Sequence, residues 1–203
     1  RPGRTDLVMS FASGGNLGQH LKKNHVSENE ARRIFSQLVD AVSYLHGKGI
    51  VHRDIKLENV MVAADGTCRL IDYNISLVVP LSPAPQQPPI VADGFLTDGV
   101  IGSRSYCAPE VKRAERYTTA VDVYSFGVLM CYMLSGTNPF AKMTEANIMF
   151  MVAMKNERPV IPSHVDKDPQ NPVFKDMIQQ LWHRDPDRRS DFETIVDQLR
   201  VHA

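Results

Sequence analysis

The chain has 203 residues, and its 23 Lys and Arg are balanced by 23 Asp and Glu, so its formal net charge at pH 7 is zero. This length, with a hydrophobic content of 43%, suffices for a hydrophobic core and excludes a chain that is disordered throughout. A neutral chain has no overall field that attracts nucleic acid or an anionic membrane, so neither is expected as a partner.

The cysteines and the start of the chain bear on its cellular location. Cys68, Cys107 and Cys131 stand far apart without metal-binding spacing, so we expect buried thiols in a reducing compartment. The most apolar stretch, residues 121–134, is too short to span a bilayer. The chain begins at Arg1 with neither an initiator Met nor a signal peptide, which predicts a piece of a longer cytoplasmic, or nuclear, protein.

The first predicted elements in chain order are a strand end and a long helix. Residues 7–9 read as the end of a buried strand. Ser27 and Glu30 have the spacing of a capping box. Behind them, apolar residues recur at helical spacing, and the two glycines Gly47 and Gly49 end the helix. The apolar positions of this helix are Ile34, Phe35, Leu38, Ala41, Val42 and Leu45.

A polar loop follows this helix and leads into a predicted hairpin. The short apolar runs 60–62 and 68–71 are joined across Asp65-Gly66, and Asp-Gly between apolar runs is a hairpin signal. Next comes a long segment with five prolines within ten residues, a composition typical of a functional or disordered loop. The rest of the chain is predicted to be helical over residues 120–134, 144–155, 173–183 and 191–201.

The polar loop, His-Arg-Asp-Ile-Lys-Leu-Glu-Asn over residues 52–59, holds the most informative residues. Phosphoryl transfer to a hydroxyl uses a carboxylate to receive the proton, a cation near the phosphoryl group and an oxygen to hold a metal. Asp54, Lys56 and Asn59 supply these three groups. Asp72 ends the second hairpin strand, which brings it back beside Asn59. One carboxylate and one amide oxygen are ligands suited to Mg²⁺.

Residues 52–59 resemble the catalytic loop H-R-D-x-K-x-x-N of the eukaryotic-type serine/threonine protein kinases, and we refer to them as the catalytic loop. Three further motifs follow in the order of that family. They are Ala-Pro-Glu at 108–110, Asp-x-x-Ser-x-Gly at 122–127 and Asp-Pro-Asp-Arg-Arg at 185–189. Together the four motifs extend the resemblance over essentially the whole chain.

The resemblance implies an α+β, mainly α fold. Residues 1–203 would be part of a kinase catalytic domain, namely its hinge and helical C-terminal lobe, with a short β-hairpin carrying the catalytic loop. The activation segment would span about residues 72–110. The sequence contains no glycine-rich phosphate loop, V-A-I-K lysine or helix-C glutamate, the family parts that cover ATP phosphates. We therefore expect the N-terminal β lobe to be absent from this chain, and the fragment not to phosphorylate efficiently alone.

The resemblance also assigns roles in catalysis, with ATP and Mg²⁺ as cofactors. Asp54 would be the catalytic base and Lys56 the cation that faces the phosphate. Asn59 and Asp72 would be the metal ligands. A lysine two residues after the aspartate is the serine/threonine kinase pattern, so the expected partner is a protein substrate with a Ser or Thr hydroxyl.

At the other end of the chain, the resemblance assigns residues to nucleotide binding. Met9 would be the gatekeeper, and the backbone of Ser10 and Ala12 would meet the adenine. Met61 would form the floor of the adenine slot. Asn16 stands where the family often has an acidic residue that contacts the ribose.

Four residues around the catalytic loop receive structural or regulatory roles from the resemblance. His52 would pack beneath Tyr73, and Arg53 would bind a phosphate on the activation segment. The candidate phosphate acceptors on that segment are Ser76, Ser82, Thr97, Ser103 and Ser105. Ser103 replaces a family threonine and keeps the hydroxyl that could bond Asp54.

More distant residues are expected to have structural roles. Asp122 would anchor the backbone of the catalytic loop, and Glu110 would form a buried ion pair with Arg189. His46, like the other histidines outside the catalytic loop, is assigned to a solvated or capping position, and Lys112-Arg113 is assigned to solvent.

The sequence departs from the family pattern after the metal-binding aspartate. Asp72-Tyr73-Asn74 stands where the family usually has D-F-G. Tyr73 keeps the aromatic ring but adds a hydroxyl that requires a partner if buried. Asn74 is the mildest replacement for glycine if that position needs a positive φ. Because the metal ligand remains, we interpret the change as compatible with activity.

Two functions follow from these observations. The first is a serine/threonine protein kinase that transfers the γ-phosphoryl group of Mg-ATP, in which Glu58 could face a basic residue of the substrate. The alternative is a pseudokinase-like scaffold or protein-interaction module. That alternative would bind partners through the long proline-rich loop and the methionine-rich helix around 143–154. Separately, an adaptor domain could bind the Pro80–Pro89 loop.

Overall fold

The computed structural model describes residues 9–23, 26–79, 102–115, 117–138, 140–161 and 172–201. The helices of this part are α1 (Leu17–Lys23), α2 (Glu28–Gly47), α3 (Pro109–Lys112), α4 (Ala120–Ser135), α5 (Glu145–Met149), α7 (Pro172–Leu181) and α8 (Phe192–Val201). Shorter turns are the 3-10 helices η1 (Leu57–Asn59) and η3 (Pro186–Arg188) and the π-helix η2 (Phe150–Met154). The strands are β1 (Ile50–Val51), β2 (Val60–Val62), β3 (Cys68–Leu70) and β4 (Leu77–Val78).

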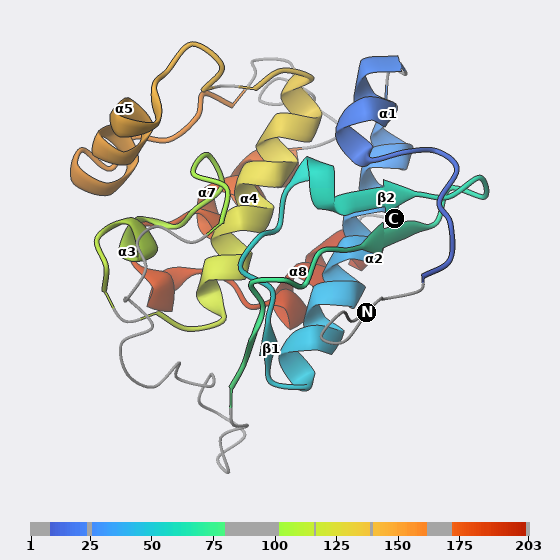
Figure 1. Ribbon diagram of the computed structural model, residues 1–203, viewed down its shortest axis with the longest axis horizontal. Coiled ribbons are helices and arrows are strands. Elements are labelled where there is room, and N and C mark those ends of the chain that lie inside the picture. The colour runs from blue at the N-terminus through green and yellow to red at the C-terminus, as the bar shows by residue number, and fades with distance from the viewer. Residues whose placement is uncertain are drawn as a thin grey trace, which may run out of the picture.

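Helix α4 forms the centre of the core. Every residue from Val121 to Met133 is buried, because this helix is apolar on all sides and neighbours cover it all round. Figure 1 shows α4 crossing the middle of the molecule, with α2 on one side and α5 projecting on the other. Helix α7 packs closely on α4 at Gly127, where an added Cβ would lie 2.8 Å from the Cβ of Leu181.

Helix α2 begins and ends where the sequence predicts. The Ser27 Oγ accepts a hydrogen bond from the Glu30 backbone N–H at 3.3 Å, so the predicted capping box is present. The helix ends at Gly47, and Gly49 follows with a φ of 70°. Its apolar face contributes Ile34, Phe35 and neighbouring residues to the core, where α2 also contacts α8.

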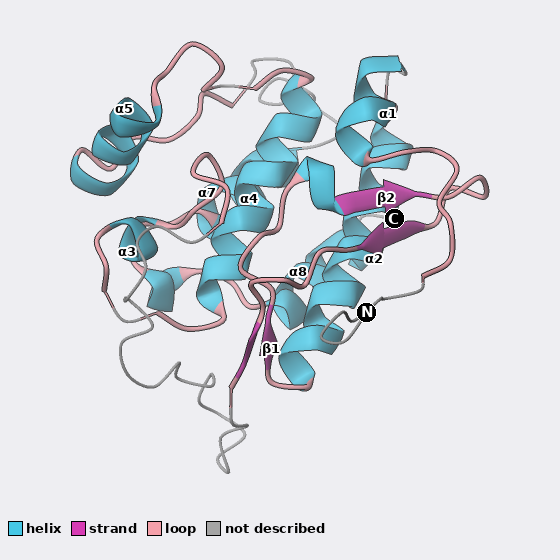
Figure 2. Cartoon of the chain, in the orientation of Figure 1, coloured by secondary structure: helices cyan, strands magenta, loops and turns pink. Residues whose placement is uncertain are grey.

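The two small sheets position the catalytic loop at both of its ends. Strands β2 and β3 form the predicted antiparallel hairpin, with Val60 opposite Leu70 and Val62 opposite Cys68. Strands β1 and β4 form a second antiparallel pair that the sequence analysis does not anticipate, with Ile50 opposite Val78. Figure 2 shows these two strand pairs against the otherwise helical chain. The described residues therefore have the expected mainly helical fold with small sheets.

Two predicted elements differ from the structure. The helix expected over 144–155 divides into α5 and the π-helix η2, because the hydrogen-bond ladder changes register at Phe150. Met9, expected at the end of a buried strand, is not in a strand and is 54% exposed; residues 7 and 8 lie outside the described residues. The Pro80–Pro89 loop, with Ser82 and Thr97, also lies outside them.

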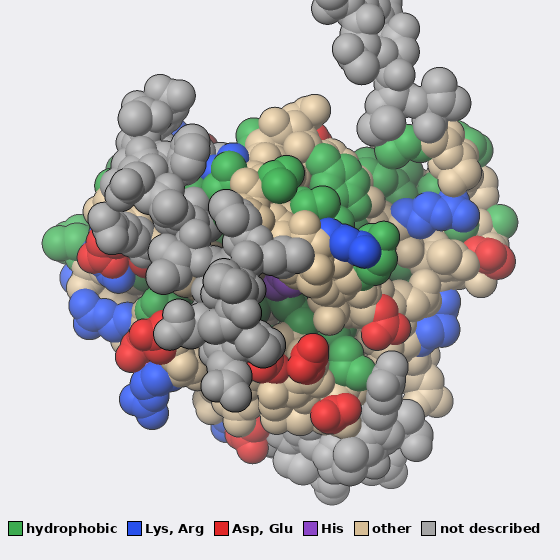
Figure 3. Space-filling view, turned by 90° about the horizontal axis from the view of Figure 1, so that it is seen from below, with side chains coloured by type: hydrophobic (Ala, Val, Ile, Leu, Met, Phe, Trp, Pro, Cys, Tyr) green, Lys and Arg blue, Asp and Glu red, His purple; other side chains and the backbone are tan. Residues whose placement is uncertain are grey.

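The surface carries both signs of charge, as the zero net charge requires. On the face in Figure 3, acidic and basic side chains are interspersed with apolar ones. Within the described ranges no helix has the length and apolar character needed to cross a bilayer.

Candidate active site

The backbone of the catalytic loop is anchored by Asp122, which lies in the first turn of α4 and is completely buried. Its Oδ2 accepts the backbone N–H of His52, and its Oδ1 accepts that of Arg53, each at 2.8 Å. Backbone N–H groups in a loop lack the partners that a helix or sheet would give them. One carboxylate can accept several hydrogen bonds, so Asp122 alone satisfies both of these N–H groups. The geometry matches the anchoring role expected for Asp122.

Asp54 lies at the centre of the site with its carboxylate surrounded by donors. Its Oδ2 accepts the Lys56 Nζ at 2.6 Å and the Asn59 Nδ2 at 2.9 Å. Its Oδ1 accepts the Ser103 backbone N–H at 3.0 Å. Burial by itself would raise the pKa of Asp54, but the Lys56 ammonium and the Ser103 hydrogen bonds outweigh it and hold this pKa below its usual value. Asp54 is therefore ionised at neutral pH and can accept a proton.

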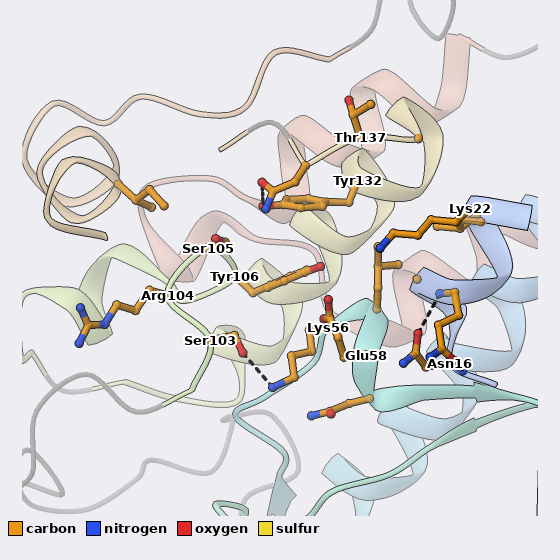
Figure 4. Close-up of a pocket in the computed structure, with 18 of the residues that line it drawn as sticks. Asn16, Lys22, Lys56, Glu58, Ser103, Arg104, Ser105, Tyr106, Tyr132 and Thr137 are labelled. Atoms are coloured by element: carbon orange, nitrogen blue, oxygen red, sulfur yellow. Dashed lines mark hydrogen bonds between the residues drawn. The ribbon is translucent and has the colours of Figure 1, made fainter. Parts of the chain in front are cut away.

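Lys56 links the catalytic loop to the end of the activation segment. Besides Asp54, its Nζ donates to the Ser103 Oγ at 2.9 Å, as Figure 4 shows. The segment approaches closely because residue 102 is glycine: with φ at +85°, an added Cβ would lie 2.6 Å from the Arg53 carbonyl oxygen. The cation, the acceptor carboxylate and the segment are thus fixed relative to one another.

Asn59 and Asp72, the two expected metal ligands, come from the two ends of the hairpin. The Asn59 Nδ2 donates to the Asp54 carbonyl and Oδ2, both at 2.9 Å, which fixes the amide so that its Oδ1 faces away. The Ile71 backbone N–H donates to the Asn59 carbonyl at 2.9 Å, which brings the residue before Asp72 beside Asn59. Asp72 is exposed, and within the described ranges its carboxylate makes no hydrogen bond or ion pair.

The chemistry of these two ligands fits magnesium. An amide oxygen and a carboxylate are hard donors, and Mg²⁺ in proteins often takes one or two such ligands together with substrate phosphates and water. Across the part of the chain that the structure describes, no group of three His, Cys, Asp or Glu side chains could hold a metal by itself. An ion bound by Asn59 and Asp72 would take its remaining ligands from water or from a substrate phosphate.

The backbone is strained at two of these functional positions. Arg53 and Asp72 have φ values of 67° and 68°, which non-glycine residues adopt only at some cost. Asn74 has no positive φ, so the reason offered for asparagine at that position is wrong. Asp72 itself adopts the left-handed backbone conformation, whereas Asn74 does not, so position 74 does not require a glycine in this structure.

Tyr73 packs on the catalytic loop through its ring. The ring centroids of Tyr73 and His52 lie 5.0 Å apart in an edge arrangement, as the resemblance implies. The Tyr73 hydroxyl donates to the Leu70 carbonyl at 3.2 Å, which supplies the partner that the additional polar group requires. Burial raises the pKa of Tyr73, so its hydroxyl stays protonated.

Arg53, expected to bind a phosphate on the activation segment, contacts uncharged groups. Its Nε donates to the Ile75 carbonyl, and its Nη1 donates to the Tyr117 hydroxyl at 2.9 Å. Ser76, a candidate phosphate acceptor, lies nearby and donates from its Oγ to the His52 carbonyl at 3.3 Å. The Arg53 guanidinium therefore joins the start of the activation segment to Tyr117, which follows that segment, through neutral hydrogen bonds.

The residues assigned to nucleotide binding lie along the first described segment and β2. Asn16 forms a β-bridge with Met61, so the predicted ribose and adenine-floor positions are neighbours. Ala12 is buried, whereas Met9 and Ser10 are exposed. The structure thus brings Asn16 and Met61 together and leaves Met9 and Ser10 on the surface.

A groove of about 850 Å³ runs beside Lys56. Figure 4 shows that it lies between α1, the catalytic loop, the 103–106 segment and α4. Tyr106 and Tyr132 form one part of its lining, with ring centroids 5.0 Å apart and an interplanar angle of 26°. Glu58 also lines the groove, and its carboxylate has no hydrogen bond or ion pair within the described ranges. Burial raises the pKa of Tyr106 and raises that of Tyr132 to about 12, so both phenol groups stay protonated at neutral pH.

The expected ion pair between Glu110 and Arg189 is present and bidentate. Arg189 Nη1 lies 2.6 Å from Glu110 Oε1, and Nη2 lies 2.8 Å from Oε2. The same guanidinium lies over the ring of Tyr124, with Cζ 5.1 Å from the ring centroid. This pair joins the end of the activation segment to the 185–189 turn.

Two polar side chains lie where the sequence analysis does not expect them. His46, assigned to a solvated or capping position, places its Nε2 2.8 Å from the Asp122 Oδ2. Lys112, assigned to solvent, is only 3% exposed and donates to the Arg104 carbonyl, while burial lowers its pKa. The position of His46 in the last turn of a helix next to the catalytic loop is the one signal that could have identified it.

Comparison with known proteins identifies what the chain is similar to. The model of the protein kinase domain matches residues 2–199. The serine/threonine/tyrosine-protein kinase HT1 of Arabidopsis thaliana is 28% identical over 199 residues, 97% of this chain and 47% of that kinase. The CBL-interacting serine/threonine-protein kinase 5 of Arabidopsis thaliana is 34% identical over 192 residues, 94% of this chain and 39% of that kinase.

A third relative is the hormonally up-regulated neu tumor-associated kinase of Homo sapiens. It is 40% identical over 135 residues, which are 66% of this chain and 18% of that kinase. The chain spans less than half the length of each of these three relatives.

Proposed function

The chain belongs to the protein kinase domain family, and from this premise we propose that the protein carrying it is a serine/threonine kinase. It transfers the γ-phosphoryl group of Mg-ATP to Ser or Thr hydroxyls of proteins. The observation that carries the proposal is the donor-bound Asp54, ionised at neutral pH and held beside Lys56 and Asn59. The two relatives from Arabidopsis thaliana are named a serine/threonine/tyrosine-protein kinase and a serine/threonine-protein kinase, and both names include the Ser and Thr acceptors proposed for this chain.

Asp54 receives the proton of the attacking hydroxyl, and the geometry indicates which of its oxygens does so. Oδ2 already accepts hydrogen bonds from the Lys56 and Asn59 side chains, whereas Oδ1 accepts the Ser103 N–H. We propose that the substrate hydroxyl donates to Oδ1, because Oδ2 already has two side-chain donors.

Lys56 and the metal ligands stabilise the charge of the transferred group. The Lys56 ammonium stands between Asp54 and Ser103 and lies within reach of a phosphoryl group next to the acceptor hydroxyl. Asn59 and Asp72 would hold Mg²⁺, which when bound neutralises charge on the phosphates. We further propose that residues 1–203 form the hinge and C-terminal lobe of the kinase domain. Efficient transfer would then also need the family elements that cover the ATP phosphates.

The groove beside Lys56 supports a peptide as the substrate. Lys56 and Ser103, which both hydrogen-bond Asp54, line it. Glu58 also lines it, and within the described ranges its carboxylate has no hydrogen bond or ion pair. A basic side chain near the acceptor residue would neutralise Glu58, so we propose a preference for Arg or Lys in the substrate. A peptide array in which the Glu58→Gln variant loses no basic preference removes this part of the proposal.

A pseudokinase-like scaffold is the second candidate, and two observations favour it. The sequence has Tyr73-Asn74 in place of the usual Phe-Gly. Met149, Phe150 and Met154 are exposed on α5 and η2, where a partner protein could cover them. This function needs no phosphoryl transfer and can be separated from the first by experiment.

The test uses the full-length protein, with binding and transfer measured separately. Mg-ATP at about 100 times its Kd stabilises a binding protein by about 2.7 kcal/mol, which a thermal shift detects. We expect Asp72→Ala to lose this Mg²⁺-dependent shift. Asp54→Asn should keep the shift but lose transfer of labelled phosphate to a generic substrate. A full-length protein that shows neither shift nor transfer is not a kinase, and the scaffold remains.

A further inference from the structure

Lys112 is a buried lysine at the end of α3. It is 3% exposed, and its Nζ donates to the carbonyl of Arg104, eight positions earlier in the chain. Lysine is almost never fully buried unless it has a partner. Across the described ranges no carboxylate forms an ion pair with Lys112, and burial lowers its pKa. The Arg104 carbonyl is therefore the contact that holds this buried side chain.

The acceptor belongs to residues 103–106, which we call the groove segment because they line the groove beside Lys56. Figure 4 shows these residues along one side of the groove. The Tyr106 N–H donates to the Ser103 carbonyl at 2.9 Å, so the segment forms a turn. The Arg104 carbonyl lies inside this turn but takes no part in the bond that closes it, so it needs a donor from another element.

The other contacts of the groove segment leave the Arg104 backbone free. At the start of the segment, Ser103 is bound to the catalytic loop through its N–H at 3.0 Å and its Oγ at 2.9 Å. The Arg104 side chain pairs with Glu145 on α5, but both side chains are at least half exposed, and exposed pairs contribute little. The hydrogen bond from Lys112 is buried, is assisted by the charge of the ammonium and acts on the backbone itself. It therefore fixes the middle of the segment against α3.

The position of the groove segment matters more for a peptide than for the nucleotide. Arg104, Ser105 and Tyr106 all line the groove that we assign to the peptide. Asn16 and Met61, assigned to the nucleotide, form a β-bridge with each other instead. A displacement of the segment should therefore weaken peptide binding more than ATP binding.

We propose that Lys112 is a positioning residue for the protein substrate. By donating to the Arg104 carbonyl, it fixes the groove segment on α3 and thereby sets the shape of the groove that receives the peptide. The part of this inference that concerns the substrate rests on the proposed kinase function, whereas the part that concerns the segment does not.

The kinetic test compares Lys112→Met with Lys112→Arg in the full-length protein, on a peptide with a Ser acceptor and a nearby Arg. Methionine has a similar shape and tolerates burial but has no donor, whereas arginine keeps both the charge and a donor. We expect Lys112→Met to raise the KM for the peptide by about tenfold, since a misplacement of ~1 Å can cost on the order of 100-fold. The KM for ATP should change little, and Lys112→Arg should restore much of the peptide affinity.

Ile195→Ala is the matched control for a general loss of stability. Ile195 is fully buried on α8 and does not line the groove, so its truncation removes core packing without touching the groove segment. We expect this variant to lower the Tm and to leave the KM for the peptide unchanged. The proposal is overturned if Ile195→Ala raises this KM as much as Lys112→Met does. Equal rises in the KM for peptide and for ATP in Lys112→Met, or a loss that arginine does not restore, overturn it as well.

Hydrogen–deuterium exchange tests the structural part without any phosphate transfer. The amides of Ser103 and Tyr106 are hydrogen-bonded, and they should exchange faster in Lys112→Met than in the wild type and in Lys112→Arg. The amides of His52 and Arg53, which other contacts hold, should exchange as in the wild type. Unchanged exchange at Ser103 and Tyr106 in Lys112→Met refutes the inference even in an active kinase. If the wild type transfers no phosphate, the kinase proposal fails, and the exchange alone decides whether Lys112 holds the segment.

Discussion

Replacing Glu110 with glutamine tests how the activation segment is fastened to the core. The Arg189 side chain is 0% exposed and the Glu110 side chain 2% exposed, and two charge-assisted hydrogen bonds of 2.6 and 2.8 Å join them. In Glu110→Gln the guanidinium keeps its bonds to the carbonyls of Ala120 and His183 but loses its counter-charge. Leaving one buried partner unpaired costs about 3–5 kcal/mol.

Thermal unfolding of the full-length protein measures this loss. For a domain of this size, 1 kcal/mol corresponds to about 2–4 °C, so we expect the Tm of this domain to fall by about 6–20 °C. The double variant with Arg189→Met should lose less than the sum of the two single variants, because the second substitution removes the unpaired charge.

The pair Arg113 and Glu115 provides a matched control. It is also bidentate, through Nε and Nη2 of Arg113 with both contacts at 2.7 Å, but the Glu115 side chain is 50% exposed. Glu115→Gln should therefore cost at most about 1 kcal/mol. If Glu110→Gln and Glu115→Gln lower the Tm equally, burial does not decide the strength of these pairs and the reasoning is refuted.

Two further variants test the geometry around the catalytic base. In Lys56→Met the burial of Asp54 is no longer offset by an ammonium, so the pKa of Asp54 should rise, as carboxyl NMR titration will show. In the wild type this pKa is lowered, so the stability that Asp54 contributes is present above its unfolded-state pKa and is lost as the pH falls through its folded-state pKa. In Gly102→Ala the φ of +85° and the 2.6 Å contact of the new Cβ with a loop carbonyl should cost about 1–3 kcal/mol in thermal unfolding. Gly47→Ala, where a Cβ meets nothing within 4 Å, should cost nothing, and equal losses at both glycines would contradict the steric explanation.

Local signals in the sequence predicted much of the fold because they act between near neighbours. The Ser27 cap requires only residues three positions apart, and the hairpin requires only the Asp65-Gly66 turn between two apolar runs. The loop residues Asp54, Lys56 and Asn59 likewise come together through η1 and the start of β2. Their mutual contacts follow from a spacing of at most five positions.

Contacts between distant segments could not be predicted in the same way. Strands β1 and β4 are too short to show a periodic pattern, and only the closure of the fold brings Ile50 opposite Val78. Residue type alone assigned Lys112 to solvent and His46 to a solvated or capping position, because Lys is mostly exposed and His is only intermediate in burial. Their acceptors, Asp122 and the Arg104 carbonyl, become visible only when the helices are packed.

The two carboxylates of the site differ in their surroundings, and this difference divides the chemistry between them. Asp54 is buried and accepts hydrogen bonds from three residues, so its orientation is fixed before a substrate arrives. Asp72 is exposed, and no described residue donates to its carboxylate. A carboxylate with unused lone pairs can bind a hard cation, whereas one with a saturated Oδ2 can receive a proton only on Oδ1. An amide at position 54 would keep the shape but lose the proton acceptor, and an amide at position 72 would keep a metal oxygen but lose its charge.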